Sequence, residues 1–157
     1  MNAGPVLVDH DWISRHIPHQ GNMCLLHAVQ DWSDNEIHCL ARSHCAPDNP
    51  LRHFNGLPIS AGIEYAAQAM AVHAALLIPA DQLPDVGYLT SVRNVQWWVS
   101  RLDDVGAEIS VQASRLSGNE VSLLYDFSIF CHDRLLLSGR AGVMIKPPAS
   151  RQNSPVA

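Results

Sequence analysis

Lysine is almost absent from this chain, and charge of either sign is scarce. The 157 residues include 10 lysines and arginines, of which only Lys146 is a lysine, against 15 aspartates and glutamates. The formal net charge is therefore -5. So few cations create no basic field that would attract a phosphate backbone, which argues against nucleic-acid binding.

Several catalytic and binding signatures are also absent. The four cysteines form no Cys-x-x-Cys pair, and the chain lacks a Gly-x-Ser-x-Gly elbow, a glycine-rich phosphate loop and a dinucleotide fingerprint. The missing elbow, phosphate loop and fingerprint argue against a serine hydrolase or a nucleotide-binding protein. The cysteine pattern favours reduced thiols. Nine histidines leave a metal site to consider, because His38-Cys39 and His44-Cys45 lie close together. Alternate strand residues point to opposite faces and no further pair has zinc-type spacing, so we predict neither a metal nor a cofactor.

No segment has the pattern of a signal peptide or a membrane span. The first residues lack the basic and apolar regions of a signal peptide, so we expect a cytoplasmic protein. The most apolar stretch, residues 61–78, carries Glu64, Gln68 and His73. Polar side chains at these positions favour a buried helix of a soluble protein over a membrane span, with His73 as a packed core residue.

The spacing of apolar residues predicts one α+β domain. A hydrophobic content of 47% fits a single domain over residues 1–157, with the polar stretch 147–157 as a disordered tail. The pattern predicts a helix at 11–17, a hairpin of strands at 23–32 and 36–44, and a long helix at 61–78 with Ser60 as its N-cap. Further strands are expected at 88–99, 107–116, 121–130 and 134–145. A long helix beside an antiparallel sheet is an α+β arrangement.

Two short motifs resemble a known enzyme family. Ile17-Pro18-His19 lies between the first helix and the first strand, and Glu64 is followed four positions later by Gln68 on the long helix. Both resemble the β-hydroxyacyl-acyl-carrier-protein dehydratases, and the sequences around them are more similar still to the dehydratase-like proteins of aryl-polyene biosynthesis. The resemblance implies a hot-dog fold, in which one long central helix is wrapped by a curved antiparallel sheet of five to six strands. It also implies dehydration of 3-hydroxyacyl thioesters on acyl carrier protein to trans-2-enoyl thioesters.

This chemistry assigns roles to the residues of the two motifs. His19 is the candidate base for the C2 proton, because histidine is largely neutral near pH 7. Glu64 is the candidate acid for the departing hydroxyl, because desolvation in an apolar segment favours a protonated carboxyl. Gln68, one turn further along, can orient that carboxyl. Unpaired backbone amides from Ser60 to Gly62 are candidate donors to the thioester oxygen, with Gly62 allowing close approach of the substrate.

Two alternative functions also fit these sequence features. Hot-dog acyl-thioester hydrolases also use a helix carboxylate, although they do not require the Pro-His motif. A non-catalytic partner subunit of a heterodimeric dehydratase would keep the fold without independent activity. One feature departs from the usual dehydratases, since the loop Leu51–Pro58 matches their Gly-His-Phe-Pro-Gly segment only in part.

The expected partners follow from the same resemblance and from the strand pattern. The strand at 88–99, with Trp97 and Trp98, would expose an edge and apolar area that monomers seldom leave uncovered, so we predict a homodimer or a heterodimer with a second hot-dog subunit. The resemblance implies that His19 of one subunit faces the acid of the other. An acidic carrier would need a local basic cluster, for which the candidates are Arg93, Arg101 and Arg140.

Overall fold

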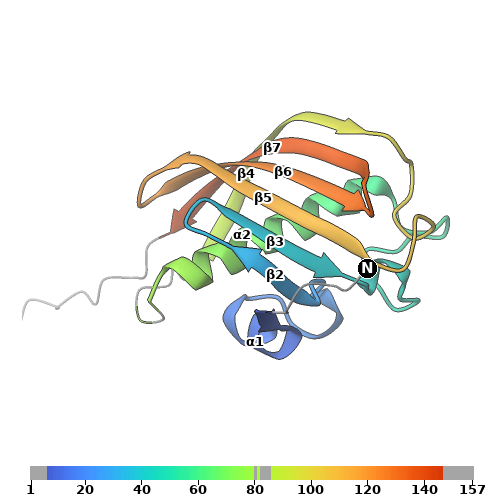
Figure 1. The fold of residues 1–157 in the computed structure, drawn as a ribbon, viewed down its shortest axis with the longest axis horizontal. Coiled ribbons are helices and arrows are strands. Elements are labelled where there is room, and N and C mark those ends of the chain that lie inside the picture. The colour runs from blue at the N-terminus through green and yellow to red at the C-terminus, as the bar shows by residue number, and fades with distance from the viewer. Residues whose placement is uncertain (1–6, 80, 82–85, 147–157) are drawn as a thin grey trace, which may run out of the picture.

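A single curved sheet wraps around one long helix in the computed structural model, which describes residues 7–79, 81 and 86–146 (Figure 1). Within these residues the sheet has seven strands in the order β1-β2-β3-β5-β6-β7-β4, and every neighbouring pair is antiparallel. The strands are β1 (Val8–Asp9), β2 (Ala28–Trp32), β3 (Glu36–Ala41), β4 (Val86–Trp97), β5 (Ile109–Gly118), β6 (Ser122–Cys131) and β7 (Arg134–Lys146). The predicted α+β arrangement of a long helix wrapped by an antiparallel sheet is confirmed. The strand count exceeds the expected five to six because the short β1 adds to the edge at β2.

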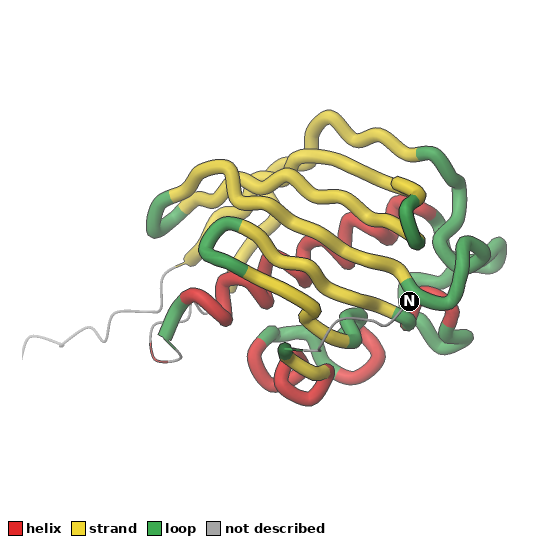
Figure 2. Tube along the Cα trace, in the orientation of Figure 1, coloured by secondary structure: helices red, strands yellow, loops and turns green. Residues whose placement is uncertain are grey.

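The long helix α2 (Gly62–Leu77) lies across the concave face of the sheet, as the tube of Figure 2 shows. Its sequence is rich in alanine, which favours a helix, and the backbone turns extended at Ile78, just before Pro79. Strands β5 and β6 alternate buried and partly exposed side chains, so one face of each packs towards α2. The result is one core between helix and sheet, with Tyr65 of α2 and Phe127 of β6 among its largest buried side chains.

The short helix α1 (His10–His16) determines where the Pro-His motif lies. Asp9 caps this helix, because its side chain accepts a hydrogen bond of 2.9 Å from the backbone N–H of Trp12. The helix ends at His16, and the next residue, Ile17, has an extended backbone, as expected for a residue before proline. The chain then passes His19 and enters a 3-10 turn at Gly21–Met23. This path leads the motif away from α1, a helix that contacts α2 and that Figure 1 shows beside β2.

Gly62 lies where α2 packs closely on side chains of β6 and β7. A Cβ atom at this position would lie 2.6 Å from Leu137 Cδ2 and 2.8 Å from Ile129 Cδ1, both closer than van der Waals contact allows. Gly62 is itself buried. Its lack of a side chain is therefore explained by helix-to-sheet packing.

Gly62→Ala should lower the free energy of unfolding by about 1–3 kcal/mol, because the added methyl group overpacks the buried side chains of Leu137 and Ile129, which must shift. Gly87→Ala is the matched control, since the nearest atom to its added Cβ is Val143 Cγ1 at 3.8 Å. Urea unfolding of both variants provides the measurement. Equal stability of the two variants would contradict the packing role of Gly62.

Two further expectations concern the C-terminal tail and a membrane span. The predicted tail at 147–157 lies outside the described residues. Among the residues that are described, no helix has the length and apolar character needed to cross a membrane.

Candidate active site

His19 and Glu64 form a pair within one chain. His19 Nε2 lies 3.1 Å from Glu64 Oε1, and the two side chains are 26% and 33% exposed. The Pro-His segment between α1 and the 3-10 turn supplies the histidine, and the first turn of α2 supplies the carboxylate. This geometry favours a pair formed within one chain over the expected pair in which His19 of one subunit faces the acid of another.

Gln68 holds the Glu64 carboxylate in place, as its spacing predicted. Its Nε2 donates to Glu64 Oε1 over 3.0 Å and to the Met23 carbonyl over 2.7 Å, and its Oε1 accepts from the Leu25 N–H over 2.9 Å. The Gln68 side chain is fully buried, so each of its polar groups is satisfied by the protein. Gln68 consequently ties Glu64 to the segment that follows His19.

The pKa of Glu64 moves in the direction opposite to the sequence-based expectation. The hydrogen bond from His19 lowers the pKa of Glu64, and the bond from Gln68 adds to this effect, whereas partial burial opposes it. The net shift is below the ordinary value of 4.5. Glu64 is therefore a carboxylate near neutral pH. The prediction that desolvation raises its pKa and keeps it protonated is wrong, because the side chains of His19 and Gln68 both place a nitrogen donor at its Oε1.

This shift predicts a specific dependence of stability on acid. A carboxyl whose pKa is lowered in the folded state stabilises the protein above its unfolded pKa, and that contribution is lost as the pH falls through the folded pKa. We expect the difference in unfolding free energy between wild type and Glu64→Gln to shrink as the pH falls below the ordinary pKa of 4.5. Urea unfolding at several pH values measures it. A difference that grows on acidification would contradict the lowered pKa.

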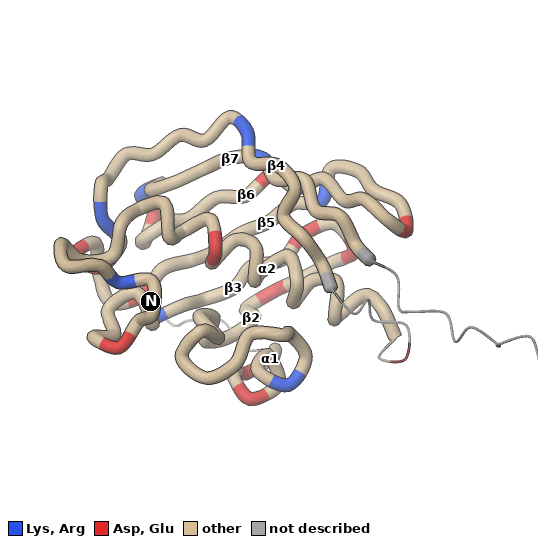
Figure 3. The backbone as a smooth tube through the Cα atoms, turned by 180° about the vertical axis from the view of Figure 1, so that it is seen from behind, with Lys and Arg blue, Asp and Glu red and all other residues tan. Residues whose placement is uncertain are grey.

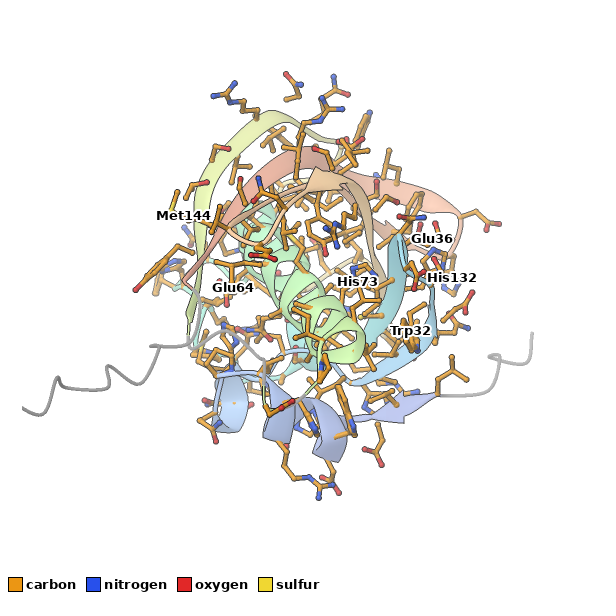
Figure 4. The ribbon with its side chains drawn as sticks, turned by 90° about the vertical axis from the view of Figure 1, so that its left-hand side faces the viewer. Trp32, Glu36, Glu64, His73, His132 and Met144 are labelled. Carbon is orange, nitrogen blue, oxygen red and sulfur yellow. The ribbon has the colours of Figure 1, made fainter. Side chains whose placement is uncertain are left out.

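An apolar cavity opens beside the pair. Its volume is about 440 Å³, and one side is formed by α2 residues with small side chains. It is lined by Arg15, His16, Ile17, Pro18, His19, Glu64, Ala67, Met70, Ala71, Ala74, Ala75, Gly87, Leu89, Leu123, Tyr125, Val143 and Ile145. Figure 4 shows Glu64 and Met144 on one side of α2, with His73 and Trp32 on the other. An apolar ligand in this cavity can place a polar end at His19 and Glu64.

The residues at the start of α2 are placed differently from expectation. Neither Ser60 nor Gly62 lines the cavity, and Ser60 is exposed in a 3-10 turn (Ile59–Ala61) without a capping side-chain bond. The Ala61 N–H donates to Pro58, and the Gly62 N–H donates to Ile59 and Ser60. The prediction that Ser60 caps the helix is wrong, and the Ala61 and Gly62 amides are already bonded because the 3-10 turn precedes the helix.

His73 is a buried core residue, as the sequence indicated. Its Nδ1 lies 2.8 Å from the Tyr125 hydroxyl and its Nε2 lies 2.8 Å from the Ser33 carbonyl. Burial lowers the pKa of His73 and raises the pKa of Tyr125 to about 12. Both groups are therefore neutral, with Nε2–H donating to Ser33 and the Tyr125 hydroxyl donating to Nδ1. Tyr125 also lines the cavity, a role that the alternating pattern of β6 did not single out.

Two of the three arginines predicted to bind a carrier protein form ion pairs within this chain. Arg101 pairs with Asp103 at 2.7 Å, and Arg140 pairs with Asp126 at 2.8 Å. Figure 3 shows the cations spread over α1, the loops and the strands rather than gathered in one patch. The described residues also contain no group of three or more histidine, cysteine, aspartate or glutamate side chains that could hold a metal ion.

Comparison with protein families identifies the chain. A family model described as ApeP-like, ApeP dehydratase, matches residues 12–153. The chain belongs to this family. The resemblance to the dehydratases, and to the aryl-polyene type in particular, is thereby confirmed. No curated protein sequence matches the chain.

Solved structures give the same fold. The dehydratase heterocomplex ApeI:P from Xenorhabdus doucetiae is similar with a TM-score of 0.74 and 26% identity, over 85% of this chain and 90% of that one. A thioesterase from Haemophilus influenzae has a TM-score of 0.65 at 7% identity, over 96% and 99%. A mutant thioesterase from Pseudomonas aeruginosa has a TM-score of 0.63 at 12% identity, over 93% and 99%. The two thioesterases support the hot-dog fold alone.

Proposed function

We propose that this ApeP-like dehydratase removes water from a 3-hydroxyacyl thioester carried on acyl carrier protein and yields the trans-2-enoyl thioester. The observation that carries the proposal is the His19–Glu64 pair at an apolar cavity of about 440 Å³. Dehydration needs a proton-transfer group beside C2 and C3 of the substrate, and the acyl chain beyond them needs an apolar site. Both requirements meet at one place in this chain.

His19 is the proposed proton carrier and Glu64 its ionic partner. The Glu64 carboxylate accepts a hydrogen bond from Nε2–H of His19, which leaves the lone pair on Nδ1. Nδ1 takes the C2 proton, and Glu64 stabilises the imidazolium that forms. The same nitrogen then returns the proton to the C3 hydroxyl, so the C2–H and C3–O bonds break and one water leaves.

The resting site must open before this transfer. His19 Nδ1 is covered from solvent and has no hydrogen-bond partner among the described residues. The substrate therefore has to shift the imidazole ring or the groups that cover it. Catalytic hydrogen bonds commonly reach their working geometry only in the substrate complex. Ser60 and Gly62 remain candidate contacts for the thioester only if the substrate extends beyond the cavity towards the start of α2.

A second hot-dog subunit is the proposed partner. The solved structure ApeI:P is a dehydratase heterocomplex. In this chain β4 is one of the two edge strands of the described sheet, with β7 as its neighbour, and it carries exposed Tyr88, Leu89 and Trp97. An uncovered apolar edge strand favours pairing with another chain. We propose that the active assembly is formed at this edge, with a second copy or with a related subunit.

Hydrolysis of the thioester is the second candidate function. The ionised Glu64 beside an apolar cavity could activate a water molecule, and several structures with the same fold are thioesterases. The two reactions leave different products. Dehydration keeps the thioester and lowers its mass by one water, whereas hydrolysis releases the free acid.

One assay tests these proposals together. Purified protein, alone and with a coexpressed hot-dog partner, is incubated with 3-hydroxyacyl-carrier substrates and analysed by mass spectrometry. We expect the mass of the carrier-bound chain to fall by one water. Free acid as the main product would establish the thioesterase instead, and activity restricted to the mixture would show that the partner subunit is required. No reaction under any condition would overturn the dehydratase proposal.

A further inference from the structure

One arginine side chain lines the cavity beside the His19–Glu64 pair. Arg15, in the last turn of α1, is the sole lysine or arginine among the described residues that line this cavity. Its side chain is exposed, so it stands at the rim rather than in the apolar interior. The rest of the lining is mainly aliphatic. A guanidinium here can therefore contact the part of a ligand that extends out of the cavity.

The guanidinium of Arg15 is not committed to an acidic side chain. Its Nε donates to the Asp11 carbonyl over 3.1 Å, and no ion pair involves Arg15 within the described part of the chain. This separates it from the arginines that do pair with carboxylates, namely Arg42, Arg52, Arg101 and Arg140. The two terminal nitrogens of Arg15 remain available to an anion, which they can bind in a fork.

Arg15 lies within reach of a pantetheine arm whose thioester is placed at His19. Arg15 precedes His19 by four residues, so their Cα atoms are at most about 14 Å apart. The arm between a thioester sulfur and its 4′-phosphate contains about thirteen bonds, close to the bond count of four peptide residues, and so spans a similar length. A thioester placed at His19 can therefore bring its phosphate to Arg15.

We propose that Arg15 is the recognition site for the 4′-phosphate of the pantetheine arm that delivers the acyl chain. The proposal rests on the proposed function, because it assumes that a thioester reacts at His19 and Glu64. It replaces the cluster of Arg93, Arg101 and Arg140, two members of which are paired with carboxylates. The guanidinium neutralises the phosphodiester at the rim while the acyl chain fills the apolar cavity.

A pair of substrates that differ only in the phosphate tests this site. The 3-hydroxyacyl thioesters of 4′-phosphopantetheine and of pantetheine are compared with wild type, Arg15→Ala and the control Arg134→Ala. Arg134 is exposed at the start of β7 and does not line the cavity. We expect Arg15→Ala to lower kcat/KM about tenfold for the phosphorylated substrate and to leave the other unchanged, which is the scale of one charge-assisted hydrogen bond. Arg134→Ala should match wild type on both.

Carrier and coenzyme A thioesters distinguish the source of the arm, since both contain the same phosphate. A higher kcat/KM of wild type on the carrier thioester identifies the carrier as the source, and the reverse identifies coenzyme A. The Arg15 site is overturned if Arg15→Ala affects the phosphorylated and unphosphorylated substrates equally. It is also overturned if the variant affects neither.

Binding measurements without turnover test the Arg15 site independently of the proposed reaction. The dissociation constants of 4′-phosphopantetheine and pantetheine are measured by calorimetry, without turnover, for wild type and Arg15→Ala. Tighter binding of the phosphorylated compound to wild type, lost in the variant, supports the site even if no dehydration is found. Equal binding of the two compounds to wild type overturns the site even if the chain is an active dehydratase.

Discussion

Glu64→Gln should lower kcat for dehydration by roughly 10²–10⁴-fold while substrate binding and fold are kept. The amide preserves the volume of the side chain and can keep the hydrogen bond from Gln68. It removes the negative charge that stabilises the imidazolium of His19 during proton transfer. The loss should therefore be in kcat rather than in KM, because the charge matters most when His19 carries the proton.

The control for this variant is Glu108→Gln, which removes the charge of another glutamate. Glu108 pairs with Arg42 at 3.0 Å and does not line the cavity. Steady-state kinetics on carrier thioesters, with circular dichroism to check the fold, provide the measurements. A folded Glu64→Gln protein with wild-type turnover would show that Glu64 is a structural residue, and the proton-transfer site would have to be sought elsewhere.

His19→Ala should also reduce dehydration by about 10²–10⁴-fold, and a Glu64→Ala chain should not rescue it. His19 and Glu64 meet within one chain, so a mixed dimer of the two variants contains no complete pair. If the pair instead formed across an interface, one of the two sites would be intact in the same mixed dimer. Coexpression with two different tags isolates that species, and its activity is compared with wild type.

His27→Ala serves as the matched control for loss of a histidine. His27 is exposed, and it does not line the cavity. If the assembly contains only one copy of this chain beside a different subunit, each variant is tested within that complex, and neither should be rescued by added chains of the other. Recovery of activity in a verified mixed dimer would show that the catalytic pair is shared between subunits.

The sequence predicted the contact between two residues of α2 correctly, but it failed for the effect of a residue from another segment and for the start of the helix. The spacing of Glu64 and Gln68 predicted their contact because residues four apart share a helix face. The ionisation of Glu64 was predicted wrongly because desolvation was visible in the apolar sequence, whereas the hydrogen bond from His19 was not. Ser60 was assigned to a cap by residue type, but a 3-10 turn already supplies bonds at that point.

Arg15 illustrates a residue that sequence reasoning passed over. A basic residue in the last turn of a short helix complements the helix dipole, so its presence there needed no further explanation. Only the fold places it at the rim of the cavity and shows that the other candidate arginines, Arg101 and Arg140, are paired. The signal that would have found it is its distance of four residues from His19.

The amino-acid sequence by itself determined what depends on neighbours along the chain. The alternation of strands such as β6, the alanine-rich helix before Pro79 and the contact of Glu64 with Gln68 all follow from local periodicity and residue type. The tertiary structure alone decided which distant groups meet. It pairs His19 with Glu64 inside one chain, lowers the pKa of that carboxyl and packs Gly62 against Leu137. These features depend on contacts between segments remote in sequence, which periodicity does not encode.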